Sequence, residues 1–441
     1  MIRSFVQKKA VRTLGLSVML LSASALAAQA VEIERVVSPN GIEAWLVEDR
    51  TVPLVAMDFS FEGGAAMDPE GQTGLATLLS STLDEGAGDM DSEAFQAKME
   101  ELAVSIGFNA TKDRFYGSLR TLTPTTDEAF DILALAVNDP RFDETAVDRM
   151  KDQLIAQVRR QQKQPNAIAG RSFMEAMLGD HPYAKPTNGT EADLEELTSE
   201  QLASQRDLLF SRDGLKIGVV GAIDAETLGP LLDEVFGSLP EDTDLPEIED
   251  AELNLGQTVA RSLPVPQTTV MMGLPGLERD DPDYQAAFVM NHILGGGTFT
   301  SWLFEEVREK RGLSYGASSS LVPYDKAGMI ITSAATRADR ANETIDVMLD
   351  QIERMANEGP TEEELAAAKR YLTGSYALRF DTSGKIAGQL VALQNADLGI
   401  DYFDRRNDEI EAVTLEDVQQ VAQRLLAGQE PTIITVGPES N

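Results

Sequence analysis

Apolar residues along this chain follow two different periods, and strand-like segments come before helix-like ones. Three segments alternate or run apolar over the length of a strand: 41–49, 54–64 and 115–122. Four stretches with helical spacing then begin near Gly74, Ser92, Thr126 and Asp143. This segregation predicts an α+β unit in which helices pack on one face of a mainly antiparallel sheet.

A large part of this pattern occurs twice. Segments 197–221 and 413–437 align without a gap at an offset of 216 residues. Each reads as a helix with a threonine at its N-cap, Thr198 or Thr414, followed by a buried strand that ends in glycine. Two longer helical segments with acidic starts repeat in the same order: 142–162 and 360–380. Two matches in one order favour two homologous domains over a chance similarity between amphipathic helices.

The two repeats are separated by an acidic segment that contains prolines and shows no hydrophobic period. These features are typical of an exposed linker. We therefore expect an N-terminal domain over 31–240, a linker over 241–256 and a C-terminal domain over 257–441.

The N terminus carries the features of a secretory signal peptide, which we place at residues 1–30. Four basic residues open it: Arg3, Lys8, Lys9 and Arg12. An apolar run follows, and the small residues "AQA" provide a cleavage site after Ala30. A membrane anchor is disfavoured because the run is shorter than the roughly 20 residues of a spanning helix. We expect a periplasmic or otherwise exported protein with no membrane span after cleavage.

Composition excludes several classes of function. The formal charge is −36, and removing residues 1–30, with their four bases and no acids, lowers it to −40, which argues against binding nucleic acid. There is no cysteine, so the exported chain must be stabilised by its core, as suits a bacterial periplasm. His181 and His292 are the only histidines, which argues against a histidine-rich metal site or a Ser-His-Asp triad.

The segment "GLATLLSSTLDEGAG", residues 74–88, reads as a helix with an apolar stripe and hydroxyl side chains elsewhere. The stripe consists of Leu75, Leu78, Leu79 and Leu83, and is explained by core packing alone. With its flanks "FEGGAAMDPEGQT" and "MDSEAFQAKMEELAVSIGFNATKDRFYGSLRTL", however, the segment resembles the pitrilysin/insulinase family of zinc peptidases, close to the mitochondrial processing peptidase branch.

The resemblance implies that this helix corresponds to one that carries His-x-x-Glu-His in active members, with two zinc ligands and a general base on one face. Here those three positions hold Thr77, Ser80 and Ser81, and the family's third ligand, a glutamate, aligns with Gln157. A neutral amide is a poor zinc ligand. The resemblance therefore implies a degenerate metal site with no cofactor in this chain, and gives His181 a structural position.

The strongest part of the resemblance lies in the second half, over 293–337. There the family's arginine and tyrosine, which bind and polarise the substrate, correspond to Arg308 and Tyr315 within "VREKRGLSYG". A guanidinium suits peptide carbonyls, and a phenol can donate to an oxyanion. From residue type alone, Arg308 could instead belong to a solvated helix face and Tyr315 to a half-buried strand.

A glycine turn precedes this pair: Gly295, Gly296 and Gly297. In the processing peptidases an extended glycine-rich loop at this place contacts substrate, so the resemblance implies a substrate-binding turn, although the version here is shorter. A tight turn is the alternative.

Together, these features predict two homologous α+β domains that form one half of a clamshell. The function implied is that of the non-metal subunit of a heterodimeric zinc metallopeptidase: a homologous partner with His-x-x-Glu-His binds the zinc, and Arg308 and Tyr315 act in trans on a peptide. The peptide would add as a strand to a sheet edge whose counterpart here lies near 58–63.

Two alternatives differ in class. A non-catalytic scaffold or peptide-binding protein, like the core subunits of the respiratory bc1 complex, would have the same fold, and Arg308 and Tyr315 weigh against it. An exported metallopeptidase that acts alone conflicts with the missing ligands. No hydrolysis is expected from this chain by itself.

Overall fold

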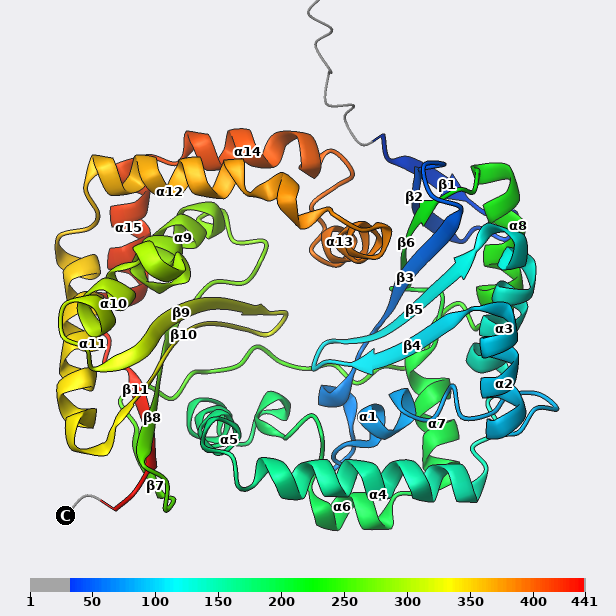
Figure 1. Cartoon of the computed structure of the whole chain (residues 1–441), viewed down its shortest axis with the longest axis horizontal. Coiled ribbons are helices and arrows are strands. Elements are labelled where there is room, and N and C mark those ends of the chain that lie inside the picture. The colour runs from blue at the N-terminus through cyan, green and yellow to red at the C-terminus, as the bar shows by residue number, and fades with distance from the viewer. Residues whose placement is uncertain (1–31, 440–441) are drawn as a thin grey trace, which may run out of the picture. The chain divides into compact units, whose positions relative to one another are not determined.

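The computed structural model describes residues 32–439, so the predicted signal peptide lies outside the described residues. From Ile33 onward the chain folds as one unit that contains two β-sheets with their helices (Figure 1). No helix in the described part of the chain has the length and apolar character needed to cross a membrane.

The first sheet has six strands and lies entirely in the N-terminal half. Its strands, in spatial order, are β1 (Glu34–Val37), β2 (Glu43–Glu48), β6 (Lys216–Gly221), β3 (Leu54–Glu62), β5 (Arg114–Leu122) and β4 (Ser105–Ala110). Only β2 and β6 pair in parallel. The sheet is therefore mainly antiparallel, as the sequence predicts.

The second sheet repeats this plan with five strands. Its order is β7 (Thr258–Ser262), β11 (Thr432–Gly437), β8 (Gln267–Pro275), β10 (Ala327–Arg337) and β9 (Ser314–Tyr324). Here β11 pairs in parallel with β7 and antiparallel with β8, just as β6 does with β2 and β3. The internal repeat found in the sequence thus corresponds to equivalent places in two similar sheets.

The helices also divide between the halves. The N-terminal half contains α1 (Leu75–Ser80), α2 (Ser92–Leu102), α3 (Thr126–Asn138), α4 (Glu144–Gln161), α5 (Pro165–Leu178), α6 (Glu191–Glu196), α7 (Ser199–Leu209) and α8 (Ala225–Phe236). The C-terminal half contains α9 (Tyr284–Asn291), α10 (Trp302–Phe304), α11 (Ala341–Asn357), α12 (Glu362–Gly374), α13 (Ser383–Asn395), α14 (Tyr402–Ala412) and α15 (Leu415–Leu426). The four predicted helix starts near Gly74, Ser92, Thr126 and Asp143 are confirmed to within one residue.

The predicted N-caps of the repeated helices are also confirmed. The side chain of Thr198 accepts from the backbone N–H of Gln201 at the start of α7. The side chain of Thr414 accepts from the backbone N–H of Asp417 at the start of α15. In both, the third helical residue bonds back to the cap, which satisfies two backbone donors at once.

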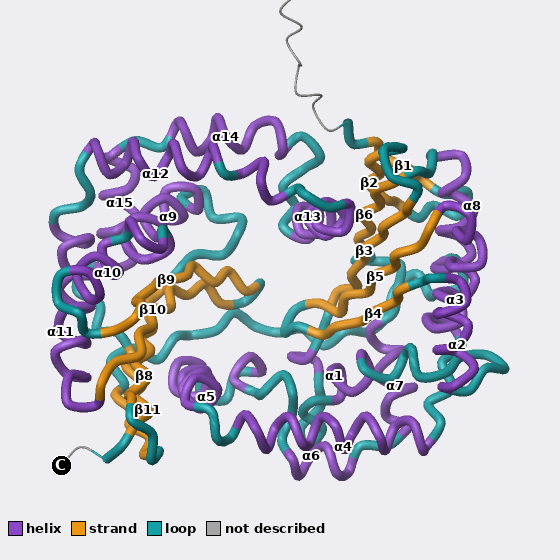
Figure 2. Tube along the Cα trace, in the orientation of Figure 1, coloured by secondary structure: helices purple, strands orange, loops and turns teal. Residues whose placement is uncertain are grey.

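Each sheet is covered on its second face by a helix from the other half. Helix α13 packs on β3 and β6 of the first sheet, and α5 packs on β8 and β11 of the second (Figure 2). A glycine permits each close approach. A Cβ on Gly218 would lie 2.5 Å from the carbonyl oxygen of Ala387, and one on Gly273 would lie 2.5 Å from the ring of Phe173. Each domain's own helices cover one face, as predicted, and this exchange covers the other.

The acidic segment between the sheets makes packing contacts and hydrogen bonds with both halves of the chain. No regular secondary structure occurs over 241–256. Leu245 packs against the first core, while Leu253 and Leu255 pack against the cluster beneath α5. The backbone N–H of Ala251 also donates to Lys326 O at 2.8 Å.

One expectation about the first sheet is wrong. Residues 58–60 do not lie at a sheet edge, because β3 pairs there with β6 on one side and β5 on the other, while Phe61 and Glu62 pair with β5 alone. The edge strands of this sheet are β1 and β4. Phe59 and Phe61 of β3 are fully buried, as suits a central strand.

Candidate functional site

Helix α1 presents its hydroxyls to backbone carbonyls. Thr77 Oγ1 donates to Thr187 O at 2.7 Å, Ser80 Oγ donates to Thr77 O at 2.8 Å, and Ser81 Oγ donates to Leu78 O at 2.9 Å. The helix is shorter than its sequence suggests, since it ends at Ser80. The leucine stripe is buried as predicted: Leu75, Leu78, Leu79 and Leu83.

These positions do not suit a metal. The hydroxyls already bond to carbonyls, and Gln157 lies exposed on α4. Over 32–439, no three His, Cys, Asp or Glu side chains gather closely enough to hold an ion. Zinc prefers imidazole, thiolate and carboxylate ligands, which Thr77, Ser81 and Gln157 do not provide.

A buried carboxylate that sequence reasoning missed holds the start of α1. Asp68 is 2% exposed, and its carboxylate accepts from the backbone N–H of Gly74 at 2.8 Å and of Ala76 at 2.9 Å. Burial raises the pKa of Asp68 to about 7, although these backbone donors act against the rise. The sequence signal was weak, because Asp68 precedes the helix by seven residues, outside the usual N-cap position.

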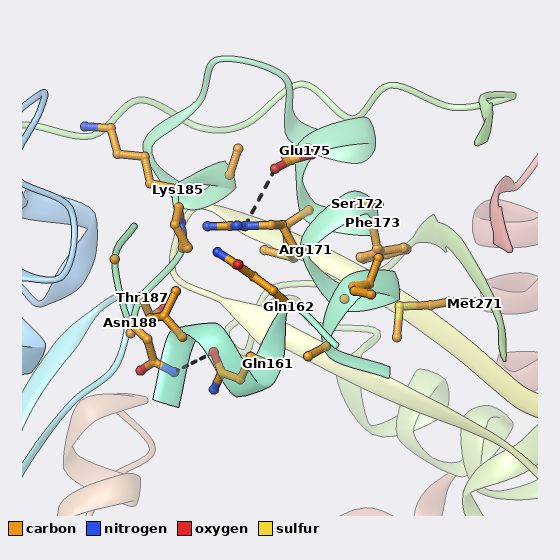
Figure 3. A pocket seen from close by; sticks show the side chains of 18 of the residues that line it. Gln161, Gln162, Arg171, Ser172, Phe173, Glu175, Lys185, Thr187, Asn188 and Met271 are labelled. Carbon is orange, nitrogen blue, oxygen red and sulfur yellow. Dashed lines mark hydrogen bonds and ion pairs between the residues drawn. The ribbon is translucent and has the colours of Figure 1, made fainter. Parts of the chain in front are cut away.

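A cavity of about 620 Å³ is lined in part by residues 184–189, where the Thr187 carbonyl accepts from Thr77 of α1. It is bounded by the end of α4, by α5, and by the second sheet. Figure 3 shows the side chain of Arg171 between Glu175 and Gln162. The lining combines apolar side chains with four bases: Lys112, Arg171, Lys185 and Arg261.

Lys112 is the most buried of these bases, at 8% exposure. Its Nζ donates to Lys185 O at 2.8 Å, and burial lowers the pKa of Lys112 to about 8. The lining residues come from segments that lie far apart in the sequence, so no local motif marks the cavity.

The predicted Arg308 lies in the turn before β9, and Tyr315 is the second residue of β9. Arg308 belongs to a short π-helical turn, η6 (Glu305–Glu309), which packs on β9. Its guanidinium lies 4.8 Å from the ring centroid of Phe304, and Nη1 pairs with Glu309 Oε1 at 2.6 Å. Tyr315 is 88% exposed. Tyr315 is therefore an exposed strand residue, not the half-buried one that residue type alone allowed.

The glycines before this pair have different environments. A Cβ on Gly295 would lie 2.3 Å from the backbone nitrogen of Ser319 in β9, and one on Gly297 would lie 2.8 Å from His292 O. Packing therefore explains Gly295 and Gly297, while Gly296 is exposed and a Cβ there would lie 3.0 Å from Asn291 Nδ2.

The candidate residues form two separate groups. Thr77 and Ser80 belong to α1 and Ser81 is its C-cap; α1 also packs on α4, the helix that carries Gln157. Among the described residues, no hydrogen bond or ion pair joins this group to Arg308 or Tyr315.

The two histidines take structural positions in the described fold. His181 Nε2 lies 2.9 Å from Glu249 O in the linker, and His181 Nδ1 accepts from the backbone N–H of Tyr183. His292 is buried and stacks on Tyr371.

Comparison with known proteins identifies the family of this chain. Residues 44–191 match the family described as insulinase (peptidase family M16), and residues 196–372 match the peptidase M16 inactive domain. A non-peptidase homolog, YmxG of Helicobacter pylori, is 25% identical over 383 residues, covering 85% of this chain and 86% of that protein. An uncharacterized zinc protease of Mycobacterium tuberculosis is 29% identical over 308 residues, covering 68% of this chain and 69% of that protein.

A solved structure extends the likeness over the described fold. The peptidase M16 inactive domain from Pseudomonas fluorescens superposes with a TM-score of 0.87 at 29% identity, covering 93% of this chain and 99% of that one. With both M16 domains matched in sequence and a solved M16 structure matched in fold, the chain is a member of the peptidase M16 (insulinase) family.

Proposed function

We propose that this chain is the metal-free subunit of an exported two-chain zinc peptidase of the processing-peptidase type. A homologous partner carries the zinc and hydrolyses the peptide, and this chain contributes Arg308 and Tyr315. The observation that carries the proposal is the contrast between an α1 without metal ligands and a Tyr315 that is 88% exposed at the start of β9.

The two side chains are suited to act on a bound peptide. A zinc held by the partner would supply an activated water, and the carbonyl oxygen of the scissile bond would then carry the negative charge that this chain's side chains stabilise. The Tyr315 hydroxyl donates to that oxygen, and the Arg308 guanidinium binds peptide carbonyls and holds the strand in place. The stacking of Arg308 on Phe304 keeps the planar group oriented before the peptide arrives.

The relatives support a role without independent catalysis. One is named a non-peptidase homolog, and the solved structure is described as an inactive domain. Other relatives are named zinc proteases, so the family includes proteins described in both ways. The naming of the Helicobacter relative also favours a second candidate, a peptide-binding scaffold with no part in hydrolysis.

Co-expression with an M16 homologue that carries His-x-x-Glu-His tests the pairing. Size-exclusion chromatography should give one complex near twice the mass of a single chain, with about one zinc for each pair. The isolated chain should bind no stoichiometric zinc. Two independent peaks would reject the subunit proposal, and about one zinc per isolated chain after mild chelation would reject the degenerate metal site.

A further inference from the structure

A second cavity, of about 350 Å³, lies away from both candidate groups. Helices α9, α13 and α14 line it, together with the tip of the β9–β10 hairpin and Tyr116 of β5 (Figure 1). Its walls are rich in aromatic rings: Tyr116, Tyr284, Phe288, Tyr376 and Tyr402. Because all of these residues belong to one chain, the cavity does not depend on the proposed partner.

Three arginines line this cavity in a chain whose formal charge is −36: Arg279, Arg379 and Arg406. The one acidic residue in the lining, Asp325, pairs with Arg114 at 2.5 Å. None of the three arginines has a carboxylate within 4.0 Å among the described residues. The cavity therefore concentrates positive charge that the fold leaves uncompensated.

The burial of Arg406 without a carboxylate partner among the described residues lowers the stability of the fold. Arg406 is 4% exposed, and its Nη1 donates only to neutral groups, Leu372 O at 3.1 Å and Asn407 Oδ1 at 2.9 Å. Burial lowers its pKa, and the charges of Arg379 and Arg279 lower it further. A buried charge without a partner is destabilising. The neighbouring Arg405 shows the usual solution, since it pairs with Asp401 and Glu409.

A hydrogen-bond donor without a partner lies beside Arg406. The guanidinium of Arg406 lies 3.9 Å from the ring centroid of Tyr376, and the Tyr376 hydroxyl is buried without a hydrogen-bond partner in the described structure. Burial raises the pKa of Tyr376 to about 12, so the hydroxyl keeps its proton at neutral pH. Native proteins leave few such groups, and each needs an explanation.

The Tyr402 hydroxyl is a third polar group among the residues that line this cavity. Tyr402 lies 5% exposed, and its hydroxyl accepts from Arg279 Nη2 at 2.8 Å and from Gln285 Nε2 at 2.9 Å. Arg279 also lies 4.1 Å from the ring centroid of Tyr284. Both contacts hold the guanidinium in one orientation, and neither neutralises its charge.

We infer that this cavity binds the C-terminal carboxylate of a peptide, with the arginines as counter-charges and the Tyr376 hydroxyl as a donor. A carboxylate accepts a bidentate pair from a planar guanidinium and has a lone pair for the phenol. The aromatic and aliphatic walls accommodate the terminal side chain: Phe288, Leu393 and Leu398. The proposed donors are side chains, and apolar residues stand among the rest of the lining, which favours a carboxylate on an apolar residue over inorganic phosphate.

Calorimetry on the purified chain alone tests the inference. The probes are N-acetyl-Ala-Ala-Phe with a free carboxylate, the same peptide amidated, an amidated peptide with an internal glutamate, and inorganic phosphate. The free acid should bind at least about ten-fold more tightly than the other three. Equal binding of the amidated peptide, or no binding of the free acid, would overturn the site. Tighter binding of the internal glutamate or of phosphate would overturn the C-terminal assignment.

Variants separate binding from folding. Arg379 is exposed, so Arg379→Ala should fold normally and weaken the free acid about ten-fold, while Arg370→Ala, an exposed arginine outside the cavity, should not. Tyr376→Phe removes only the unpaired hydroxyl. It should leave the Tm unchanged or higher and still weaken binding. A higher Tm with unchanged affinity would mean that the hydroxyl has no ligand.

Discussion

The two halves of this chain present their polar side chains in opposite ways. At α1, in the first half, Thr77, Ser80 and Ser81 all donate to carbonyls of their own chain. At the start of β9, in the second half, Tyr315 is 88% exposed and its hydroxyl makes no hydrogen bond to any described residue. Side chains already bonded within a fold add to its stability, whereas an exposed aromatic ring gains most from being covered by another molecule.

The proposed function treats this difference as the loss of one part of a site and the retention of another. Hydroxyls in a helix can turn back to carbonyls three or four residues earlier, so replacing metal ligands with serine or threonine leaves no buried group unpaired. Arg308 and Tyr315 contribute little to the core of their own domain. Under the proposed function, their role is contact with a peptide.

The largest expected effect comes from Tyr315→Phe in the assembled pair. The variant keeps the ring and removes one donor to the developing oxyanion, which typically costs about 10²–10³ in turnover. Steady-state peptide hydrolysis measures it. Tyr371→Phe is the matched control, because Tyr371 is also exposed, at 56%, but belongs to α12 and stacks on His292.

Assembly must be unaffected for that result to count, so chromatography should give the same complex for wild type and variant. Arg308→Ala should lower turnover in the same assay, whereas Arg337→Ala, an exposed arginine paired with Asp339, should not. Wild-type turnover by Tyr315→Phe would make the scaffold function the better description.

The second effect concerns Asp68, whose carboxylate accepts hydrogen bonds from the backbone at the start of α1. Its pKa rises on folding from 3.8 to about 7. The folded state therefore binds the proton more tightly, and this contribution to stability is complete below about pH 4 and is lost as the pH rises through about 7. Within that window the free energy of unfolding should fall by about 1.4 kcal/mol per pH unit from this group.

Urea unfolding of wild type and Asp68→Asn from pH 4.5 to 8 isolates this term. Burial also raises the pKa of Asp84 to about 6. Its contribution to the pH dependence of the free energy of unfolding has the same sign in both proteins, so it cancels when one curve is subtracted from the other. Stability curves that run parallel across the range would show that Asp68 ionises normally in the fold.

Much of this fold could be predicted from the sequence because its signals are local. The starts of α2 and α3, the caps Thr198 and Thr414, and the repeated β6 and β11 all follow from short-range patterns. The exchange of α5 and α13 could not be predicted this way. It depends on Gly218 and Gly273, and a glycine in a strand does not reveal which distant helix will cross it.

The candidate site divides in the same way. Arg308 and Tyr315 lie within one continuous motif, so a family resemblance could select them. Asp68 and the arginines around Tyr376 could not be selected, because their meaning depends on burial and on partners far away in the sequence. The expected edge near 58–63 failed for a related reason, since a strand's neighbours in a sheet depend on topology.

A third prediction separates packing from binding at the glycine turn. Gly295→Ala places a Cβ 2.3 Å from the backbone nitrogen of Ser319, and such overpacking should cost about 1–3 kcal/mol in urea unfolding. Gly316→Ala is the control, because its Cβ would meet nothing within 4 Å. Equal stability of the two variants would remove the packing explanation for Gly295.

The smallest expected effects test whether the hydroxyl side chains of α1 take any part in peptide hydrolysis. Thr77→Val removes the only side-chain donor to Thr187 O in the described structure and should cost about 1 kcal/mol. Ser81→Ala should change stability by less than about 0.5 kcal/mol, because its hydroxyl bonds only to carbonyls of its own helix. Both variants, paired with the wild-type metal-bearing partner, should hydrolyse peptide at the wild-type rate. A ten-fold loss of turnover in Ser81→Ala, without loss of assembly, would mean that the hydroxyl acts on substrate and that α1 retains part of the site.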